Sequence, residues 1–193
     1  MIDVGCGGGL VGRYLAKSVQ GDVVGIDMAE SAMRSSHRES WSAARFVCAN
    51  VARLPFAAAS FDVALAIDCL HLCADLFGVL VEIRRTPVMG GVLIGSAYRV
   101  ADSLGKKRPR RWWTTMFSRA GFAVEDWIDV TQECKHTMTA KHRRRWDERD
   151  RLIDMFGPPA LAACQVSERM LGEDGQPGFI DTNARWEFVA STR

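Results

Sequence analysis

Short apolar runs alternate with amphipathic segments along the chain, and this alternation is its most informative pattern. Five apolar runs predict strands, at residues 2–4, 22–27, 44–50, 61–68 and 90–98. Three segments between them predict helices, at residues 10–18, 29–41 and 74–86. Strands that alternate with helices are typical of βαβ units, which assemble a mainly parallel sheet. The pattern therefore predicts an α/β fold.

The pattern continues through the second half of the chain. A helix is expected over residues 112–122, a sixth strand over 123–133 and a final strand over 185–191. The residues between those two strands are expected to form two helices. In the first helix, Trp146, Ile153 and Phe156 recur at helical spacing. The Pro158–Pro159 pair separates it from a second helix over residues 160–171.

The composition narrows the class of protein. The chain has 193 residues, of which 48% are hydrophobic and 25% charged, with a net charge of +2. These values predict one globular domain over residues 1–193 and no strong field toward nucleic acid. No apolar stretch approaches the roughly 20 residues that a membrane span needs. The six cysteines are scattered without zinc-type CxxC pairs, which predicts no metal site and a reduced, cytoplasmic protein.

The segment IDVGCGGGLVGRYLA near the N-terminus contains two overlapping glycine patterns. Gly7-x-Gly9-x-x-Gly12 fits the dinucleotide loop of a nicotinamide enzyme, and Asp3-x-Gly5-x-Gly7-x-Gly9 fits the nucleotide loop of an S-adenosylmethionine-dependent methyltransferase. In both, glycines after a strand let the backbone turn sharply and approach a ligand closely. The loop itself leaves the two cofactors, and a plain tight turn, as alternatives.

One further residue fits both cofactors, and two others distinguish them. Asp27 ends the second predicted strand, where an acid can accept hydrogen bonds from ribose hydroxyls in either reading. Asp3 places a carboxylate inside the first strand, which suits a ligand that carries an ammonium group. Asn50 follows the third strand, where its side-chain amide can pair with an adenine edge. Asp3 and Asn50 favour S-adenosylmethionine over a nicotinamide cofactor.

Taken together, the motifs resemble those of class I S-adenosylmethionine-dependent methyltransferases, in the type 11 or ubiquinone-biosynthesis-like small-molecule group. The matching segments are IDVGCGGG, VVGIDMAESAM, ANVARLPF, SFDVALAIDCLH, EIRRTPVMGGVLI and RAGF. This resemblance implies a three-layer Rossmann-like sandwich with a seven-stranded, mainly parallel sheet and an antiparallel last strand. It also implies a helical substrate-cap insert at about residues 134–183.

The resemblance assigns nine residues to the cofactor S-adenosyl-L-methionine. They are Asp3, Gly5, Gly7, Gly9 and Ile67 around the methionine portion, Asp27 at the ribose, and Met28, Asn50 and Val51 at the adenine. The chain departs from the family at Gly8, where Thr is usual, at Asn50, where Asp is commoner, and at Pro87, which is displaced from its usual place before the glycine pair. The helices that usually precede the first motif are not in the sequence, which predicts either a start internal to a longer gene or an open cofactor site.

A general base is needed only where the methyl-accepting atom is protonated. His71, just after the fourth strand, is the candidate base, with Asp68 on the same loop. The alternative for His71 is a packed residue at the start of a helix. The other histidines, at positions 37, 136 and 142, are expected on solvated surfaces.

The insert is expected to contact a small-molecule acceptor. Its apolar side chains either line a pocket or only bury the insert against the sheet, and they are Met138, Trp146, Ile153, Met155, Phe156 and Met170, with Trp112 and Trp113 from the preceding helix. Nothing in the sequence identifies the acceptor atom or the oligomeric state.

Two rival functions stay open. KKRPRRWW and KHRRRW mix basic and aromatic residues, as in an RNA methyltransferase, although the acidic stretch DERDRLID offsets their charge. A catalytically impaired S-adenosylmethionine-binding module is the second rival. A nicotinamide oxidoreductase has no support beyond the glycine loop.

Overall fold

The computed structural model describes residues 1–18, 21–36, 44–99, 108–172 and 178–192. Contacts divide the chain into two compact units. The sheet unit comprises Met1–Ile128 and Trp186–Arg193, and the helical unit comprises Asp129–Arg185. Each unit is described by itself.

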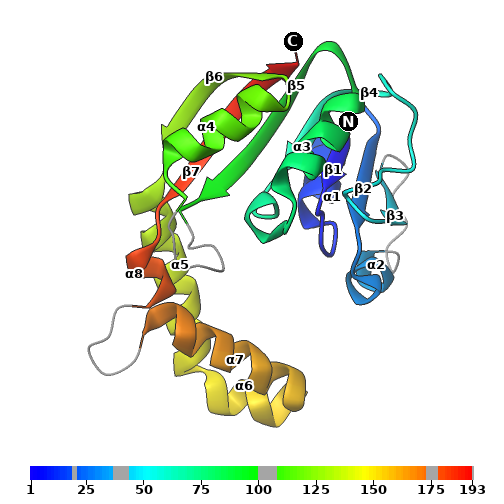
Figure 1. Ribbon diagram of the computed structural model, residues 1–193. Coiled ribbons are helices and arrows are strands. Elements are labelled where there is room, and N and C mark those ends of the chain that lie inside the picture. The colour runs from blue at the N-terminus through cyan, green and yellow to red at the C-terminus, as the bar shows by residue number, and fades with distance from the viewer. Residues whose placement is uncertain (19–20, 37–43, 100–107, 173–177, 193) are drawn as a thin grey trace. The chain divides into compact units, whose positions relative to one another are not determined.

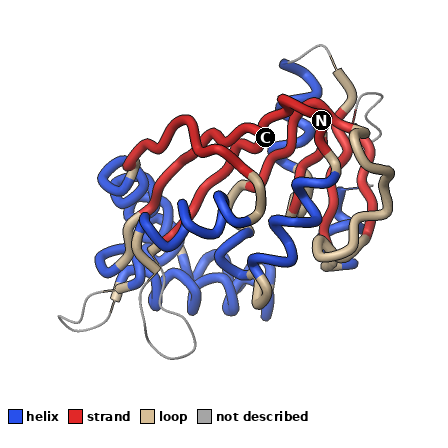
Figure 2. The backbone as a smooth tube through the Cα atoms, turned by 45° about the horizontal axis from the view of Figure 1, so that its top comes forward, coloured by secondary structure: helices blue, strands red, loops and turns tan. Residues whose placement is uncertain are grey.

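Seven strands form one sheet in the order β3-β2-β1-β4-β5-β7-β6 (Figure 1), and Figure 2 draws the strands in red. The strands are β1 (Ile2–Val4), β2 (Val23–Asp27), β3 (Ala44–Cys48), β4 (Phe61–Ala66), β5 (Pro87–Tyr98), β6 (Phe122–Asp129) and β7 (Arg185–Thr192). The first five pair in parallel, and β7 runs against β5 and β6 (Figure 1). This confirms the mainly parallel seven-stranded sheet with an antiparallel last strand.

Helices α1 (Leu10–Ser18), α2 (Glu30–Ser36), α3 (Leu76–Arg85) and α4 (Arg110–Arg119) connect these strands. The connections through α1 and α2 step from β1 toward β3, whereas α3 steps the opposite way from β4 to β5. Because such crossovers are right-handed, α1 and α2 cover one face and α3 the other. In Figure 1, α3 and α4 lie in front of the strands. The direction reverses between β1 and β4, and ligands of such sheets bind at the carboxyl ends of the strands there.

The core of the sheet unit is apolar at its centre and aromatic at one end. Ile2 and Val4 of β1 are fully buried between β2 and β4, so even this three-residue strand is central. Under α4, the Phe117 ring lies 4.6 Å from that of Phe188 on β7. Trp113 is fully buried, and its indole N–H donates to the Tyr98 carbonyl at 3.1 Å. Trp113 therefore belongs to the core and not to an acceptor pocket.

Several predicted element ends are corrected by the structure. The helix predicted over residues 112–122 is α4, which stops before Gly121, a glycine with φ of 86°, so that Phe122 begins β6. The sixth strand ends at Asp129, and Thr131 begins a helix, because the Asp129 carboxylate accepts the Thr131 N–H at 2.9 Å. Strands β3 and β4 each end two residues earlier than predicted. The second helix is described over Glu30–Ser36, and the rest of its predicted range, including His37, lies outside the described residues.

The helical unit contains α5 (Thr131–Asp147), α6 (Arg149–Phe156), α7 (Pro158–Leu171) and α8 (Phe179–Thr182) among its described residues. The prediction of two helices is therefore wrong. The first predicted helix is broken at Glu148, so Trp146 lies on α5 whereas Ile153 and Phe156 lie on α6. Helices α5 and α6 both pack against α7.

His142 is buried inside the helical unit, which corrects the prediction that it is solvated. Its side chain is 4% exposed, and its Nδ1 lies 3.0 Å from the Ser167 hydroxyl on α7. All six cysteines are free thiols. Within the described residues, no helix is long and apolar enough to cross a bilayer, and no group of acidic, His and Cys side chains could hold a metal ion.

Candidate functional site

The loop after β1 is shaped by its glycines. Gly5, Gly7 and Gly9 have φ values of 70°, 53° and 76°, a region that side chains other than glycine rarely adopt. A Cβ added at Gly5 would lie 2.5 Å from the Cβ of Cys69, and one at Gly9 would overlap the Phe46 ring. A Cβ at Gly7 would meet nothing within 4 Å. The loop is thus tightly packed beneath Gly5 and Gly9 and open at Gly7, where bare backbone can face a ligand.

Asp27 is fixed at the rim of this loop by two backbone amides. The Gly7 N–H donates to its Oδ2 at 2.8 Å, and the Ala29 N–H donates to its Oδ1 at 2.9 Å. A carboxylate has about four acceptor positions, so each oxygen can accept a further hydrogen bond from a ligand hydroxyl. The structure therefore brings Asp27 and Gly7 together, as a ribose site requires.

Asp3 is a buried carboxylic acid under the same loop. Its side chain is 2% exposed, and Oδ2 has no hydrogen-bond partner among the described residues. Burial raises the pKa of Asp3 to about 6, Asp27 adds to that rise, and the Gly12 amide opposes it. A cation placed beside the loop would lower this pKa again, because opposite charges favour the ionised form.

The residues assigned to the adenine lie in the loops after β2 and β3. Met28 is 69% exposed, so its side chain is available for contact with a ring. Asn50 is exposed, and its Oδ1 accepts the Ala52 N–H at 2.9 Å, which shapes the turn after β3. Its side-chain oxygen is therefore already engaged, which the sequence did not indicate. Val51 is half-buried in the same turn.

Two residues missed by the sequence analysis hold the loop after β3 in place. The Arg85 guanidinium donates to the carbonyls of Phe56 and Leu54 at 2.7 and 3.1 Å. Glu82 accepts the Leu54 N–H at 2.8 Å and pairs with Arg85 at 2.7 Å. The pair thus ties α3 to the loop that carries Asn50.

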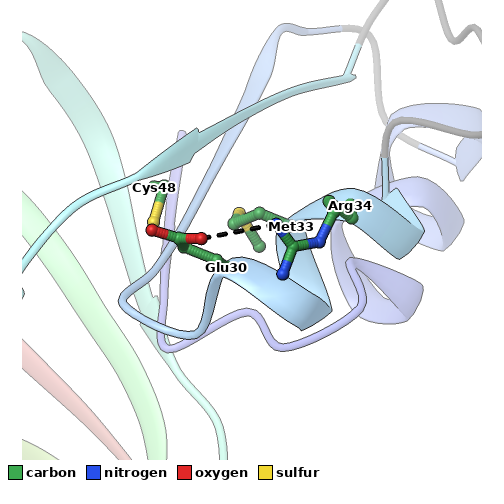
Figure 3. Close-up of a pocket in the computed structure, with 4 residues that line it drawn as sticks. All are labelled: Glu30, Met33, Arg34 and Cys48. Carbon is green, nitrogen blue, oxygen red and sulfur yellow. Dashed lines mark hydrogen bonds and ion pairs between the residues drawn. The ribbon is translucent and has the colours of Figure 1, made fainter.

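A pocket of about 340 Å³ opens between α2 and the end of β3 (Figure 3). Its described lining residues are Glu30, Met33, Arg34 and Cys48. Glu30 and Arg34 pair at 3.4 Å across one turn of α2, and both are well exposed. None of the nine residues assigned to the cofactor is among these four. This pocket therefore does not include the residues that the sequence analysis assigned to the cofactor.

The loop after β4 is held in a strained conformation by β5. Asp68 has φ of 54°, which is uncommon for a residue other than glycine. Its N–H donates to the Ser96 hydroxyl at 2.8 Å, and that hydroxyl donates to the Asp68 Oδ1 at 2.6 Å. Ser96 is fully buried. Strain that neighbouring groups enforce in this way is typical of functional sites, and Ile67 next to it is half-buried.

His71 lies on a short 3-10 turn, Leu70–Leu72, that follows Asp68. Its ring is 4.7 Å from the Tyr98 ring, and its Nδ1 is buried without a hydrogen-bond partner among the described residues. Burial lowers the pKa of His71; the Asp68 charge opposes this, and the Arg108 charge adds to it. His71 is therefore neutral near pH 7, which a general base requires.

Cys69 connects the loop after β4 to the glycine loop after β1. Its thiol donates to the Val4 carbonyl at 3.1 Å, and its Cβ fills the space beside Gly5. The loops after β1 and β4 are therefore in direct contact. Because β1 to β4 are parallel, the predicted residues after each strand all lie at one edge of the sheet.

Residues 2–95 match the family model described as a methyltransferase domain, type 11. The chain contains a type 11 methyltransferase domain. This confirms the resemblance, and it implies S-adenosyl-L-methionine as the methyl donor of the domain.

Relatives of this methyltransferase domain differ in what their names state. Sterol 24-C-methyltransferase of Aspergillus fumigatus is 28% identical over 137 residues, which cover 68% of this chain and 36% of that protein. The human mitochondrial protein named arginine-hydroxylase NDUFAF5 is 33% identical over 97 residues, or 50% of this chain and 28% of that one. The chain thus spans about a third of the length of these curated relatives.

Solved structures share the fold of the methyltransferase domain. Phosphoethanolamine N-methyltransferase 2 of Haemonchus contortus, in complex with phosphomonomethylethanolamine and S-adenosylhomocysteine, superposes with a TM-score of 0.82. The identity is 18%, and the match covers 100% of this chain and 48% of that one. At this identity the likeness shows the class I fold, the seven-stranded sheet with its helices, and not the substrate.

Proposed function

We propose that this chain transfers the methyl group of S-adenosyl-L-methionine to a small-molecule acceptor. The observation that carries the proposal is the Asp27 carboxylate, held by the amides of Gly7 and Ala29 beside an open glycine turn. This arrangement offers acceptors for a ribose diol and bare backbone for an amino-acid group. A dinucleotide-binding site would use the same glycines and Asp27, but it gives no role to the buried carboxylate of Asp3.

The roles proposed for the cofactor residues follow from their environments. Asp27 binds the ribose hydroxyls, and Met28 packs against the adenine while Asn50 and Val51 meet its edge. Asp3 is too buried for open contact, so it acts mainly through its charge, which favours a cationic ammonium beside Gly5 and Gly7. Gly9 and Ile67 complete the methionine end.

When bound, S-adenosyl-L-methionine supplies a methyl group on a positively charged sulfur. The protein contributes chiefly by holding the acceptor in line with that methyl, and such positioning is worth up to ~7–11 kcal/mol. Where the accepting atom carries a proton, neutral His71 removes it. Asp68, whose charge already favours protonated His71, then stabilises the imidazolium.

The helical unit is the proposed acceptor cap. In the sequence it is inserted between β6 and β7. Met155 and Phe156 are 58% and 61% exposed, and exposed apolar side chains of this size suit a hydrophobic acceptor. Removing these two side chains should weaken acceptor binding and leave cofactor binding unchanged.

The RNA alternative is weakened by burial. Each basic–aromatic stretch has a ring that is buried in a packed interior, Trp113 in the first and His142 in the second. A buried ring cannot stack on a base. A noncatalytic binding module would have the same fold, so a measurement of turnover is needed to distinguish it from an enzyme.

The first experiment is calorimetric titration of the purified chain with S-adenosylhomocysteine, and with NAD as the control. Micromolar binding of S-adenosylhomocysteine alone would support the cofactor assignment. Binding of NAD alone, or of neither ligand by a folded chain, would contradict it.

An acceptor screen with S-adenosylmethionine should then yield a product heavier by one methylene unit. A product that instead gains an oxygen atom would show an activity of the kind named for the human relative. Binding without any product across the screen would favour the noncatalytic module.

A further inference from the structure

Arg108, just before α4, has no ion-pair partner among the described residues. Its guanidinium carbon lies 4.6 Å from the centre of the Trp112 ring, a cation–π contact. One terminal nitrogen, NH1, is buried and has no hydrogen-bond acceptor among the described residues. A buried N–H group on a charged side chain is costly to leave unpaired, so an acceptor that is absent from the described chain is expected there.

Arg108 is connected to the candidate base through Tyr98. Trp113, next to Trp112 on α4, donates to the Tyr98 carbonyl at 3.1 Å, and the Tyr98 ring packs on His71. The Arg108 charge also lowers the pKa of His71, after the larger effect of burial. It likewise opposes the rise that burial causes in the pKa of Cys73. No described carboxylate comes within ion-pair distance of Arg108, whereas Glu82, Glu30 and Asp22 each meet an arginine elsewhere. The nitrogen is thus unpaired on the side of the molecule where the acceptor would react.

We propose that Arg108 is an anion-binding residue for the methyl acceptor, and that the acceptor carries a carboxylate. This proposal rests on the proposed function, because the acceptor is the molecule placed beside His71. The half-buried guanidinium would bind the carboxylate and so hold the accepting atom against the His71 ring. Arg108 is therefore a specificity-determining residue, and His71 keeps the role of base.

The local charge favours a carboxylate over a phosphate. Among the described residues, Arg108 is the cation and Asp68 the anion whose charges act on His71, which is itself neutral. One guanidinium compensates one negative charge and the Asp68 charge disfavours a second, whereas a phosphate monoester carries close to two at pH 7. The planar guanidinium also matches the geometry of a carboxylate.

The test uses the full chain saturated with S-adenosylhomocysteine. The probes are three compounds of one scaffold, 4-hydroxybenzoate, 4-hydroxybenzamide and 4-hydroxyphenyl phosphate, together with acetate as a minimal carboxylate. Calorimetry measures their binding to the wild type, to Arg108→Gln and to the matched control Arg111→Gln. Arg111 is an exposed residue in the first turn of α4.

We expect the carboxylates to bind more tightly than the amide and the phosphate. Arg108→Gln should weaken carboxylate binding about tenfold or more, the loss typical of one charge-assisted pair. Arg111→Gln should bind as the wild type does. Carboxylate binding should also raise the pKa of His71, followed by its ring resonances in NMR, and this shift should vanish in Arg108→Gln.

Three outcomes would overturn the carboxylate subsite. These are equal binding of carboxylate and amide, unchanged binding in Arg108→Gln, and tighter binding of the phosphate. Absence of binding by any of the four probes counts against it as well. Failure of the proposed function would be seen separately, as failure of the wild type to bind S-adenosylhomocysteine before any probe is added.

Discussion

The proposed cofactor side and the proposed acceptor side of the site are built in different ways. The loop after β1 takes its shape from glycines at positive φ, and its Gly7 amide donates to the Asp27 carboxylate. The loop after β4 is held by side chains from other segments: Ser96 fixes Asp68, and Tyr98 packs on His71. The first kind of site depends on few residue types in a fixed order, whereas the second depends on which strands become neighbours.

The largest expected effect is at Gly9. Gly9→Val places a branched side chain at φ of 76° and against the Phe46 ring, so S-adenosylhomocysteine binding should weaken at least about a hundredfold, or the chain should fail to fold. The matched control is Gly8→Ala, because Gly8 is not at positive φ and a Cβ there meets nothing within 4 Å. Calorimetry and thermal unfolding measure both variants. Equal effects at the two glycines would show that the backbone account of the loop is wrong.

Asp27→Ala should weaken S-adenosylhomocysteine binding by at least about tenfold, because the ribose loses a charged acceptor. The control is Asp22→Ala, because Asp22 directly precedes β2, the strand that ends at Asp27. Asp22 pairs only at the surface, 3.5 Å from Arg45, and exposed pairs contribute little. A folded Asp27→Ala variant with unchanged affinity would refute the ribose contact.

Asp3→Asn should separate stability from binding. The pKa of Asp3 is raised from 3.8 to about 6 in the folded chain, so the folded state binds this proton more tightly than the unfolded state does. Stability is therefore lost as pH rises from about 4 through about 6. Removing the charge should raise the free energy of unfolding at pH 7 by roughly 2–3 kcal/mol.

The affinity for S-adenosylhomocysteine should rise with pH, whereas the stability of the folded chain falls. S-adenosylhomocysteine should bind the wild type more tightly as pH rises through about 6, because ionised Asp3 favours the ammonium group. Asp3→Asn should bind several-fold more weakly at pH 7 and lose that pH dependence. Titrations at pH 5 and pH 7 decide the matter, and a variant with the wild-type pH dependence would remove Asp3 from the site.

Ser96→Ala addresses the acceptor side and should have the smallest effect on binding. The change frees Asp68 from its two hydrogen bonds with the Ser96 hydroxyl, so turnover should fall about tenfold or less while S-adenosylhomocysteine affinity stays unchanged. Ser118→Ala, on the outer surface of α4, is the control. Loss of cofactor affinity in Ser96→Ala would mean that the two sides are one cooperative unit.

The sequence by itself determined the parts of this protein that depend on local chemistry. Strand–helix alternation predicted the positions of the first five strands along the chain, the glycine spacing predicted the loop after the first strand, and Asp27 was predicted from its place at the end of the second strand. These features were readable because a positive φ demands glycine, and because a parallel sheet places every strand's carboxyl end at one edge.

Tertiary structure alone decided which side chains meet. Ser96 reaches Asp68 across 28 positions of the chain, and Arg85 reaches Phe56 across 29, through strand register and helix packing that no local pattern encodes. His142 shows the same limit, since its burial depends on α7 supplying Ser167. A backbone conformation that requires glycine can be recognised from the sequence, because the glycine itself is visible there. The partner of a side chain depends on how the whole fold packs.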